Sequence, residues 1–200
     1  FNNLIDSIKQ NDYTLTAGDI GYHFLVRVLS KNGRSDILYK MNNRSDKPGY
    51  GLQIKKGATS LTESWSARPN VSNLHMMLGH LMEWFYSGLG GIYQTENSIA
   101  YKNIVIAPKP VGDIKWCKCS YNSPQGTISS EWKLKENTFS LTIEVPKTSS
   151  AKIIMPDTFQ NSKIEIINLI NQKPIQVDFI EGAFTVKSGK YKIVAWHDID

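Results

Sequence analysis

The sequence of 200 residues has only two cysteines, no long apolar run and no block of like charge. Cys117 and Cys119 lie two apart in an alternating stretch, where a bridge within one strand would strain the disulfide. No second Cys or His pair stands nearby at metal-ligand spacing, so we expect two reduced, partly buried thiols, no metal and no cofactor. A membrane-spanning helix needs about 20 apolar residues, and no such run is present.

Charge also argues against a nucleic-acid partner. The net charge of +5 is shared by both halves of the chain, and only Lys55 and Lys56 are adjacent basic residues. Nucleic-acid binders usually gather basic residues on one face or arm. The N-terminus has neither an initiator Met nor a basic segment before an apolar core, so it reads as a cut end rather than a secretory signal, and the compartment stays open.

The first half has helical periodicity. Asp19 is a candidate cap for a helix whose inward stripe would be Phe24, Leu25, Val28 and Leu29, with Asn32-Gly33 as its stop. Ser72 would cap a long helix ending at Gly90-Gly91. The sequence predicts helices over 2–11, 20–31, 35–41 and 72–89, with a long connection over 42–71. These are too few helices to close a ring of helical hairpins.

Near Ser98 the period changes to two, as expected for a β-sandwich. We therefore predict a helical domain over residues 1–98 and a β domain over 99–200. The expected strands are Tyr101–Ala107, Ile114–Tyr121, Gly126–Leu134, Phe139–Val145, Ala151–Met155, Lys163–Ile167, Ile175–Phe179, Ala183–Val186 and Tyr191–Trp196.

The chemistry-bearing residues gather between Gly57 and His75. Glu63 stands in a loop beside Trp65, where a partly water-excluded carboxylate can act as a general base and a flat ring can support a sugar. His75 can donate to a substrate hydroxyl. Each has a structural alternative: Ser60 and Glu63 fit a capping box, which spacing alone favours, and a single His is more often structural.

At these residues the sequence resembles the bacterial α-L-rhamnosidases, inverting glycoside hydrolases with an (α/α)6 toroid of six helical hairpins. The similar stretches are TAGDIGYHFLVRVLSKNGRSDILYKMNN (16–43), GYGLQIKKGATSLTESW (49–65) and HMMLGHLMEWFYSGLGGI (75–92). Residues 101–110 and 191–196 resemble the ends of the β-sandwich domain that follows in the family. The resemblance implies the last hairpins of an (α/α)6 toroid followed by an antiparallel β-sandwich.

The resemblance assigns roles by position. It implies that Glu63 is the general base, that His75 contacts bound rhamnose, and that Trp65 lies beside the base. Leu74 departs from the family, whose members often have Asn before this His.

An inverting hydrolase also needs a carboxylic acid about 6.5–9.5 Å from the base. The family takes it from an earlier acidic loop, and the isolated carboxylates of residues 1–56 resemble no such loop: Asp6, Asp12, Asp19, Asp36 and Asp46. We therefore expect a fragment of a rhamnoside-cleaving hydrolase that is inactive alone.

Two alternatives remain open. One is a six-hairpin glycosidase acting on another sugar, and the other is a non-catalytic carbohydrate-binding module, which would show a row of exposed aromatics on one sheet face. The toroid face with Phe24, Val28 and Leu29 would be uncovered in a fragment and promote self-association.

Overall fold

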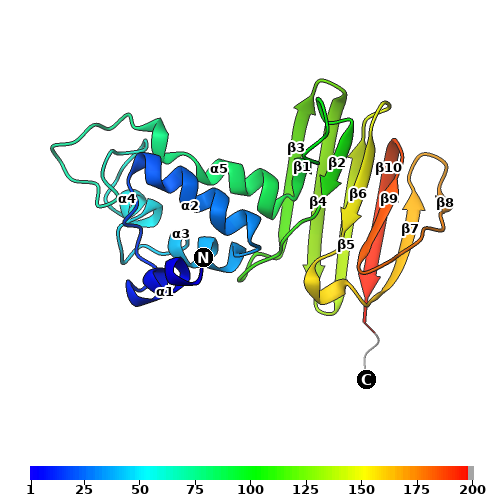
Figure 1. The fold of residues 1–200 in the computed structure, drawn as a ribbon, viewed down its shortest axis with the longest axis horizontal. Coiled ribbons are helices and arrows are strands. Elements are labelled where there is room, and N and C mark those ends of the chain that lie inside the picture. The colour runs from blue at the N-terminus through cyan, green and yellow to red at the C-terminus, as the bar shows by residue number, and fades with distance from the viewer. Residues whose placement is uncertain (198–200) are drawn as a thin grey trace. The chain divides into compact units, whose positions relative to one another are not determined.

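The structure is a computed structural model that describes residues 1–197 and divides at Trp84–Phe85 into two compact units. The first unit is helical and the second is built mainly of β-strands (Figure 1). The predicted order of a helical part followed by a sheet-rich part is confirmed. The sequence had placed the change near residue 98, later in the chain than the structure's division.

The helical unit contains four helices of six residues or more and two shorter helical turns. They are α1 (Asn2–Gln10), α2 (Asp19–Lys31), α3 (Ser35–Asn42), α4 (Tyr50–Lys55), the 3₁₀ turn η1 (Met76–Leu78) and α5 (Leu81–Trp84). Gly33 ends α2 as predicted: its φ of 68° suits glycine, and the next amide, of Arg34, returns to the Leu29 carbonyl at 2.8 Å.

The inward face of α2 differs from the prediction. Tyr22, Val26 and Leu29 are buried, whereas Phe24 and Val28 are exposed. The tyrosine points inward because its hydroxyl donates to Asn42 Oδ1 at 2.8 Å and its ring packs edge-on against Trp65. The helix also begins at Asp19 itself, with Gly18 as its N-cap, so the predicted cap at Asp19 was wrong.

The segment after residue 42 also departs from the prediction. Helix α4 lies within the stretch expected to be irregular, and Gln53 is its buried residue. The predicted helix from Ser72 does not begin there, because Ser72 pairs through both its backbone groups with Glu63 in an irregular segment. Helical structure starts only at η1 and continues as α5 and the π-helical turn η2 (Phe85–Leu89).

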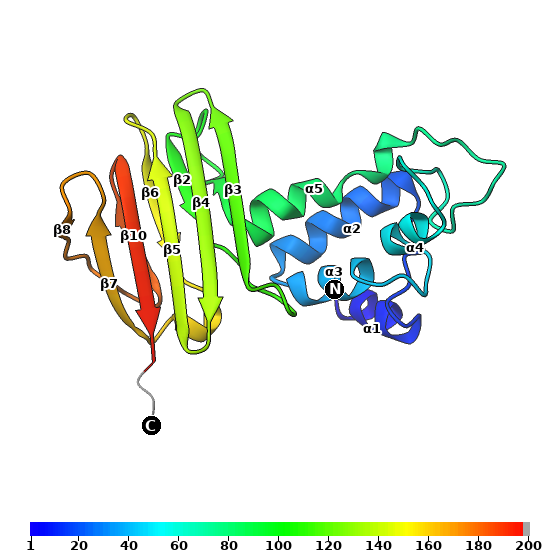
Figure 2. The ribbon, with the colours of Figure 1, turned by 180° about the vertical axis from the view of Figure 1, so that it is seen from behind.

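The second unit holds two sheets, which Figure 1 and Figure 2 show from opposite sides. A four-stranded sheet has the order β1-β2-β6-β9, and a six-stranded sheet has the order β3-β4-β5-β10-β7-β8. The strands are β1 (Ile92–Gln94), β2 (Asn103–Ile106), β3 (Trp116–Ser123), β4 (Gly126–Lys135), β5 (Thr138–Val145), β6 (Ser150–Ile154), β7 (Lys163–Asn168), β8 (Lys173–Pro174), β9 (Ala183–Val186) and β10 (Gly189–Trp196), with the 3₁₀ turn η3 (Asp157–Phe159) after β6.

A single apolar core joins the two sheets, including Ile106 and Phe184 from one and Trp132 and Ile193 from the other. Eight of the nine predicted strands therefore have counterparts in the structure, whereas Ile175–Phe179 forms no strand and the short strands β1 and β8 were missed. Pairing is antiparallel except between β2 and β6, which are parallel. The expected sandwich is confirmed with this one parallel pair.

Candidate active site

The segment 57–75 is an irregular loop whose two arms are joined by hydrogen bonds. The amide of Glu63 donates to the Ser72 carbonyl at 2.9 Å, and the amide of His75 donates to the Leu61 carbonyl at 2.9 Å. The Ser60 hydroxyl adds a bond to the Asn73 carbonyl. These bonds fix the arm that carries Glu63 against the arm that ends at His75, without regular secondary structure.

Helix α4 supports this loop from inside the helical unit. The side chain of Gln53 is buried, and its Nε2 donates to the carbonyls of Thr62 at 3.4 Å and Ser64 at 3.2 Å. The Gly49 amide donates to the Trp65 carbonyl at 3.0 Å. Since these bonds lie on both sides of Glu63, the backbone that carries its carboxylate is held on the helix. Sequence reasoning missed Gln53, although its place within an otherwise apolar pattern was a usable signal.

Trp65 is a buried anchor of the same loop. Its indole Nε1 donates to the Ala17 carbonyl at 2.7 Å, and its ring packs edge-on against Tyr22 at 4.9 Å and Tyr50 at 5.1 Å between centroids. Burial raises the pKa of the Tyr50 phenol to about 12. Only 8% of the Trp65 surface is exposed, which leaves little of the ring for a sugar.

Glu63 presents an exposed carboxylate at the bend of the loop. The Ser72 amide donates to its Oε2 at 3.2 Å, so the side chain and the backbone of Glu63 both contact Ser72. No helix begins at residue 60, which excludes the capping box that the spacing had favoured. The expected partly water-excluded setting is absent from the described residues, where the Glu63 side chain faces solvent.

His75 closes the loop and contacts the start of α2. Its Nε2 lies 3.3 Å from Asp19 Oδ2, and the side chains are 20% and 40% exposed. The pKa of the Asp19 carboxyl is lowered, first by the hydrogen bond from the Ile20 amide and then by His75. Because 56 residues separate Asp19 from His75, no local spacing in the sequence could reveal this pair.

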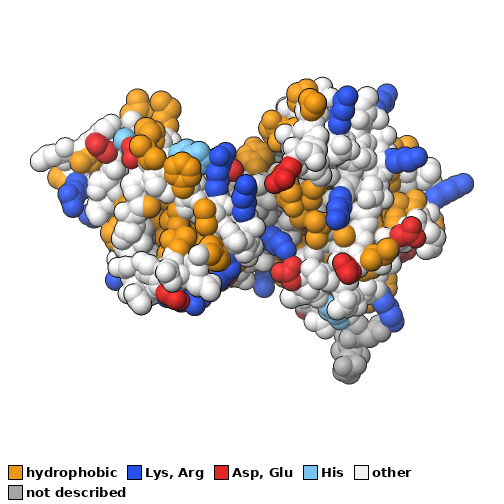
Figure 3. All heavy atoms as spheres, viewed as in Figure 1, with side chains coloured by type: hydrophobic (Ala, Val, Ile, Leu, Met, Phe, Trp, Pro, Cys, Tyr) orange, Lys and Arg blue, Asp and Glu red, His pale blue; other side chains and the backbone are white. Residues whose placement is uncertain are grey.

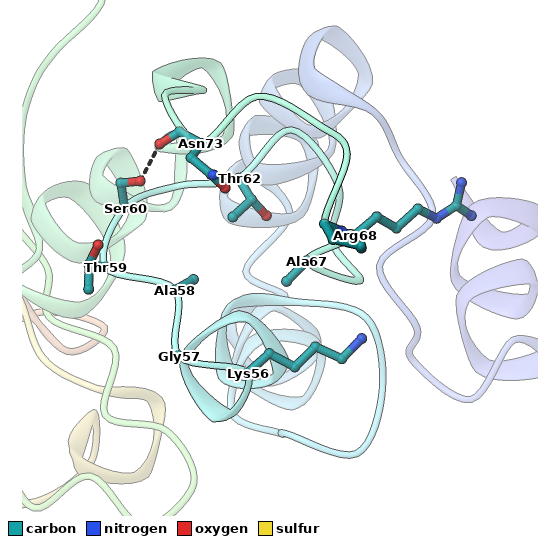
Figure 4. Close-up of a pocket in the computed structure, with 10 residues that line it drawn as sticks. Lys56, Gly57, Ala58, Thr59, Ser60, Thr62, Ala67, Arg68 and Asn73 are labelled. Atoms are coloured by element: carbon teal, nitrogen blue, oxygen red, sulfur yellow. Dashed lines mark hydrogen bonds between the residues drawn. The ribbon is translucent and has the colours of Figure 1, made fainter.

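A polar hollow of about 250 Å³ lies on the loop (Figure 4). Lys56, Thr59, Ser60, Arg68 and Asn73 are among its lining residues, and no acidic side chain is among them. The Lys56 ammonium donates to the Ser66 carbonyl at 2.7 Å. The hollow therefore offers hydroxyl, amide and cationic groups suited to polyhydroxylated ligands, close in sequence to Glu63.

An apolar surface, which we call the α2 patch, combines side chains of α2 with side chains that follow His75 in the sequence. It surrounds a hollow of about 530 Å³ lined by Ile20, His23, Phe24, Met76, Met77 and His80. Figure 3 shows apolar side chains beside histidines on the helical unit. Phe24 and Val28 are exposed, as expected for this face, whereas Leu29 is fully buried and belongs to the core. Self-association through this face stays a prediction.

The described residues contain no group of three or more side chains arranged to hold a metal ion. No helix among them has the length and apolar character required to cross a membrane. Both cysteines are free thiols, and burial raises the pKa of the Cys119 thiol to about 11.

Comparison with known families divides the chain much as its structure does. Residues 1–89 match the bacterial alpha-L-rhamnosidase six-hairpin glycosidase domain, and residues 91–166 match the bacterial alpha-L-rhamnosidase C-terminal domain. Two curated alpha-L-rhamnosidases are 28% identical to the chain: one from Formosa agariphila over 87% of this chain and 20% of its own length, and one from Streptomyces avermitilis over 76% and 16%. The chain thus spans about a fifth of these relatives.

Solved structures share the fold. The alpha-L-rhamnosidase from Dictyoglumus thermophilum aligns with a TM-score of 0.81 and 27% identity, covering 97% of this chain and 22% of the other. The Streptomyces avermitilis alpha-L-rhamnosidase, solved in complex with L-rhamnose, aligns with a TM-score of 0.82 and 25% identity, covering 96% and 19%. Both alignments include the helical and the sheet-rich units.

Proposed function

Because the chain belongs to the bacterial α-L-rhamnosidase family, we propose that it carries the general base of an inverting hydrolysis of terminal α-L-rhamnosides. Glu63 is this base. The observation that carries the assignment is an exposed carboxylate on a loop tied down on both sides, at Ser72 and through Gln53. A base must hold its water in a fixed place, and such a loop supplies that rigidity.

The hydrogen-bonding of the carboxylate supports this role. Within residues 1–197, Oε2 of Glu63 receives the Ser72 amide, while no donor is found for Oε1. One oxygen is thereby oriented by the protein and the other can accept a proton from an attacking water. The ring of Trp65 is buried beneath the loop, so we assign it to positioning Glu63 rather than to stacking on the sugar.

The general acid is proposed to come from outside these 200 residues. A general acid needs a raised pKa to carry its proton near neutral pH. The Arg34 guanidinium lowers the pKa of Asp36, and the Arg44 guanidinium lowers that of Asp46 to about 2. The pKa of Asp19 is lowered too, first by the hydrogen bond from the Ile20 amide. These three carboxylates are held ionised, which is the opposite of what the acid requires.

Hydrolysis assays test both parts of the proposal. The 200-residue chain and the full-length product of its gene are each assayed with an aryl α-L-rhamnoside, and the anomer released first is identified by proton NMR. We expect no turnover by the chain, and inversion of configuration by the longer protein. Turnover by the chain alone would refute the external acid, and release with retained configuration would refute the inverting mechanism.

A carbohydrate-binding role for the β-sandwich has less support. The candidates for an exposed row are five aromatic residues of the strands: Trp116, Tyr121, Trp132, Phe139 and Trp196. Trp132 and Phe139 are fully buried, whereas Trp116 is 65% exposed on the edge strand β3. The specificity for rhamnose over another sugar is tested in the same assay by substituting other aryl glycosides. Greater turnover of a different glycoside would favour the alternative six-hairpin activity.

A further inference from the structure

The backbone and the ring of His75 are held by different partners. Its amide donates to the Leu61 carbonyl at 2.9 Å, which fixes the main chain at the end of the loop. Its ring is held at one nitrogen only: Nε2 lies 3.3 Å from Asp19 Oδ2. In the part of the chain that the structure describes, no partner is found for Nδ1.

Asp19 is itself held in place at the first turn of α2. Its Oδ1 accepts a hydrogen bond from the Ile20 amide at 3.0 Å, while Oδ2 faces His75. One oxygen is therefore committed to the helix start and the other to the imidazole. An ionised carboxylate can only accept hydrogen bonds, so it selects a His75 ring that carries a proton on Nε2.

We propose that Asp19 is a positioning residue that occupies Nε2 of His75 and thereby presents Nδ1 to a sugar hydroxyl. This inference rests on the proposed function and on the contact with bound rhamnose that the family resemblance implies for His75. With Nε2 protonated toward Asp19, Nδ1 of the neutral ring is an acceptor for a hydroxyl proton, and Nδ1 of the cationic ring is a donor to a hydroxyl oxygen. In either state the ring plane is set by Asp19.

The Asp19–His75 pair should contribute little to the stability of the fold. Both side chains are partly exposed, at 20% and 40%, and exposed ion pairs contribute little to folding. The Leu61 carbonyl already anchors the backbone of His75. Loss of the Asp19 carboxylate should therefore change the orientation and tautomer of the ring while the fold is kept.

The substitution Asp19→Asn keeps the size of the side chain and changes the group that faces His75 from an acceptor to a donor. Its amide oxygen can still accept from the Ile20 amide, which turns the NH₂ group toward His75. That group donates to Nε2 and moves the ring proton to Nδ1. The matched control is Asp6→Asn, which changes an exposed carboxylate on α1.

Ring nitrogen NMR of the histidine-labelled chain reads this out directly, because the sequence has only four histidines. At about pH 8.5, above the ordinary range of imidazole titration, we expect the proton of His75 on Nε2 in the native chain and in Asp6→Asn, and on Nδ1 in Asp19→Asn. An unchanged tautomer in Asp19→Asn overturns the proposal.

Titration with L-rhamnose supplies the second readout. We expect the His75 Nδ1 signal of the native chain to move on binding, and the apparent Kd to rise at least about fivefold in Asp19→Asn, which corresponds to roughly 1 kcal/mol for one hydrogen bond. Equal affinity in both proteins overturns the proposal. A tautomer change with no response to rhamnose in either protein also overturns it, and leaves Glu63 to be judged separately by hydrolysis.

Discussion

Replacing Trp65 by Phe tests whether this ring anchors the loop. The change removes the indole Nε1–H that donates to the Ala17 carbonyl at 2.7 Å, which costs about 1–1.5 kcal/mol because the carbonyl is left unpaired. It also shrinks a ring that is only 8% exposed, which costs about 1–2 kcal/mol in lost burial and a partial cavity. The expected loss in the free energy of unfolding is about 2–3.5 kcal/mol.

Urea unfolding followed by far-UV circular dichroism measures this loss, because the α-helices α1 to α5 lie in the helical unit. With a denaturant slope of about 1–2 kcal/mol per molar for a unit of this size, the midpoint should fall by roughly 1–3.5 M. Trp116→Phe is the matched control, since Trp116 is 65% exposed and surface changes stay within about 0.5 kcal/mol. If Trp65→Phe behaves like this control, the ring is not an anchor and its surface is available for another role.

Two substitutions and one thiol-labelling measurement test other parts of the structure. Gly51→Ala should destabilise the helical unit by about 2 kcal/mol or more, because its new Cβ would lie 2.2 Å from the Arg44 carbonyl oxygen; a thermal melt equal to the native one would contradict the close approach. Asp46→Asn should flatten the loss of stability in acid: the pKa of Asp46 is about 2 in the folded chain against 3.8, so its contribution is present above pH 4 and lost as the pH falls toward 2. An unchanged acid limb in urea melts would refute this contribution. At pH 8, Cys119 should be alkylated by iodoacetamide far more slowly than a model thiol, since burial raises its pKa to about 11, and equal rates would show that the thiol is accessible and ionised.

The strands were predictable where each carries its own alternating pattern. The turn at Ser123–Gly126 and the alternation of β5, in which every second residue is buried, are local signals that need no tertiary context. Ile175–Phe179 carried a similar pattern but forms no strand. Local alternation therefore identified strands well, but it did not show which runs would find a partner in a sheet.

The loop was harder to predict because its contacts are distant in sequence. Leu74 and Met77 fit a helical stripe, yet both are exposed, since pairing of Ser72 and His75 with the earlier arm competes with formation of the predicted long helix. Likewise Asp19 looked like a cap until its partner His75 was known. The spacing around Glu63 favoured a capping box over a general base, and the resemblance to a family reversed that preference.

The central claim is that Glu63 is the general base, and its most direct test is the turnover of Glu63→Gln in the full-length protein that carries this chain. With an aryl α-L-rhamnoside as substrate, we predict that kcat falls at least about 100-fold while KM stays within about threefold, because a general base acts mainly in the transition state. Glu96→Gln, which changes an exposed carboxylate, should retain native turnover. A Glu63→Gln enzyme that keeps more than about a third of the native kcat would contradict the account.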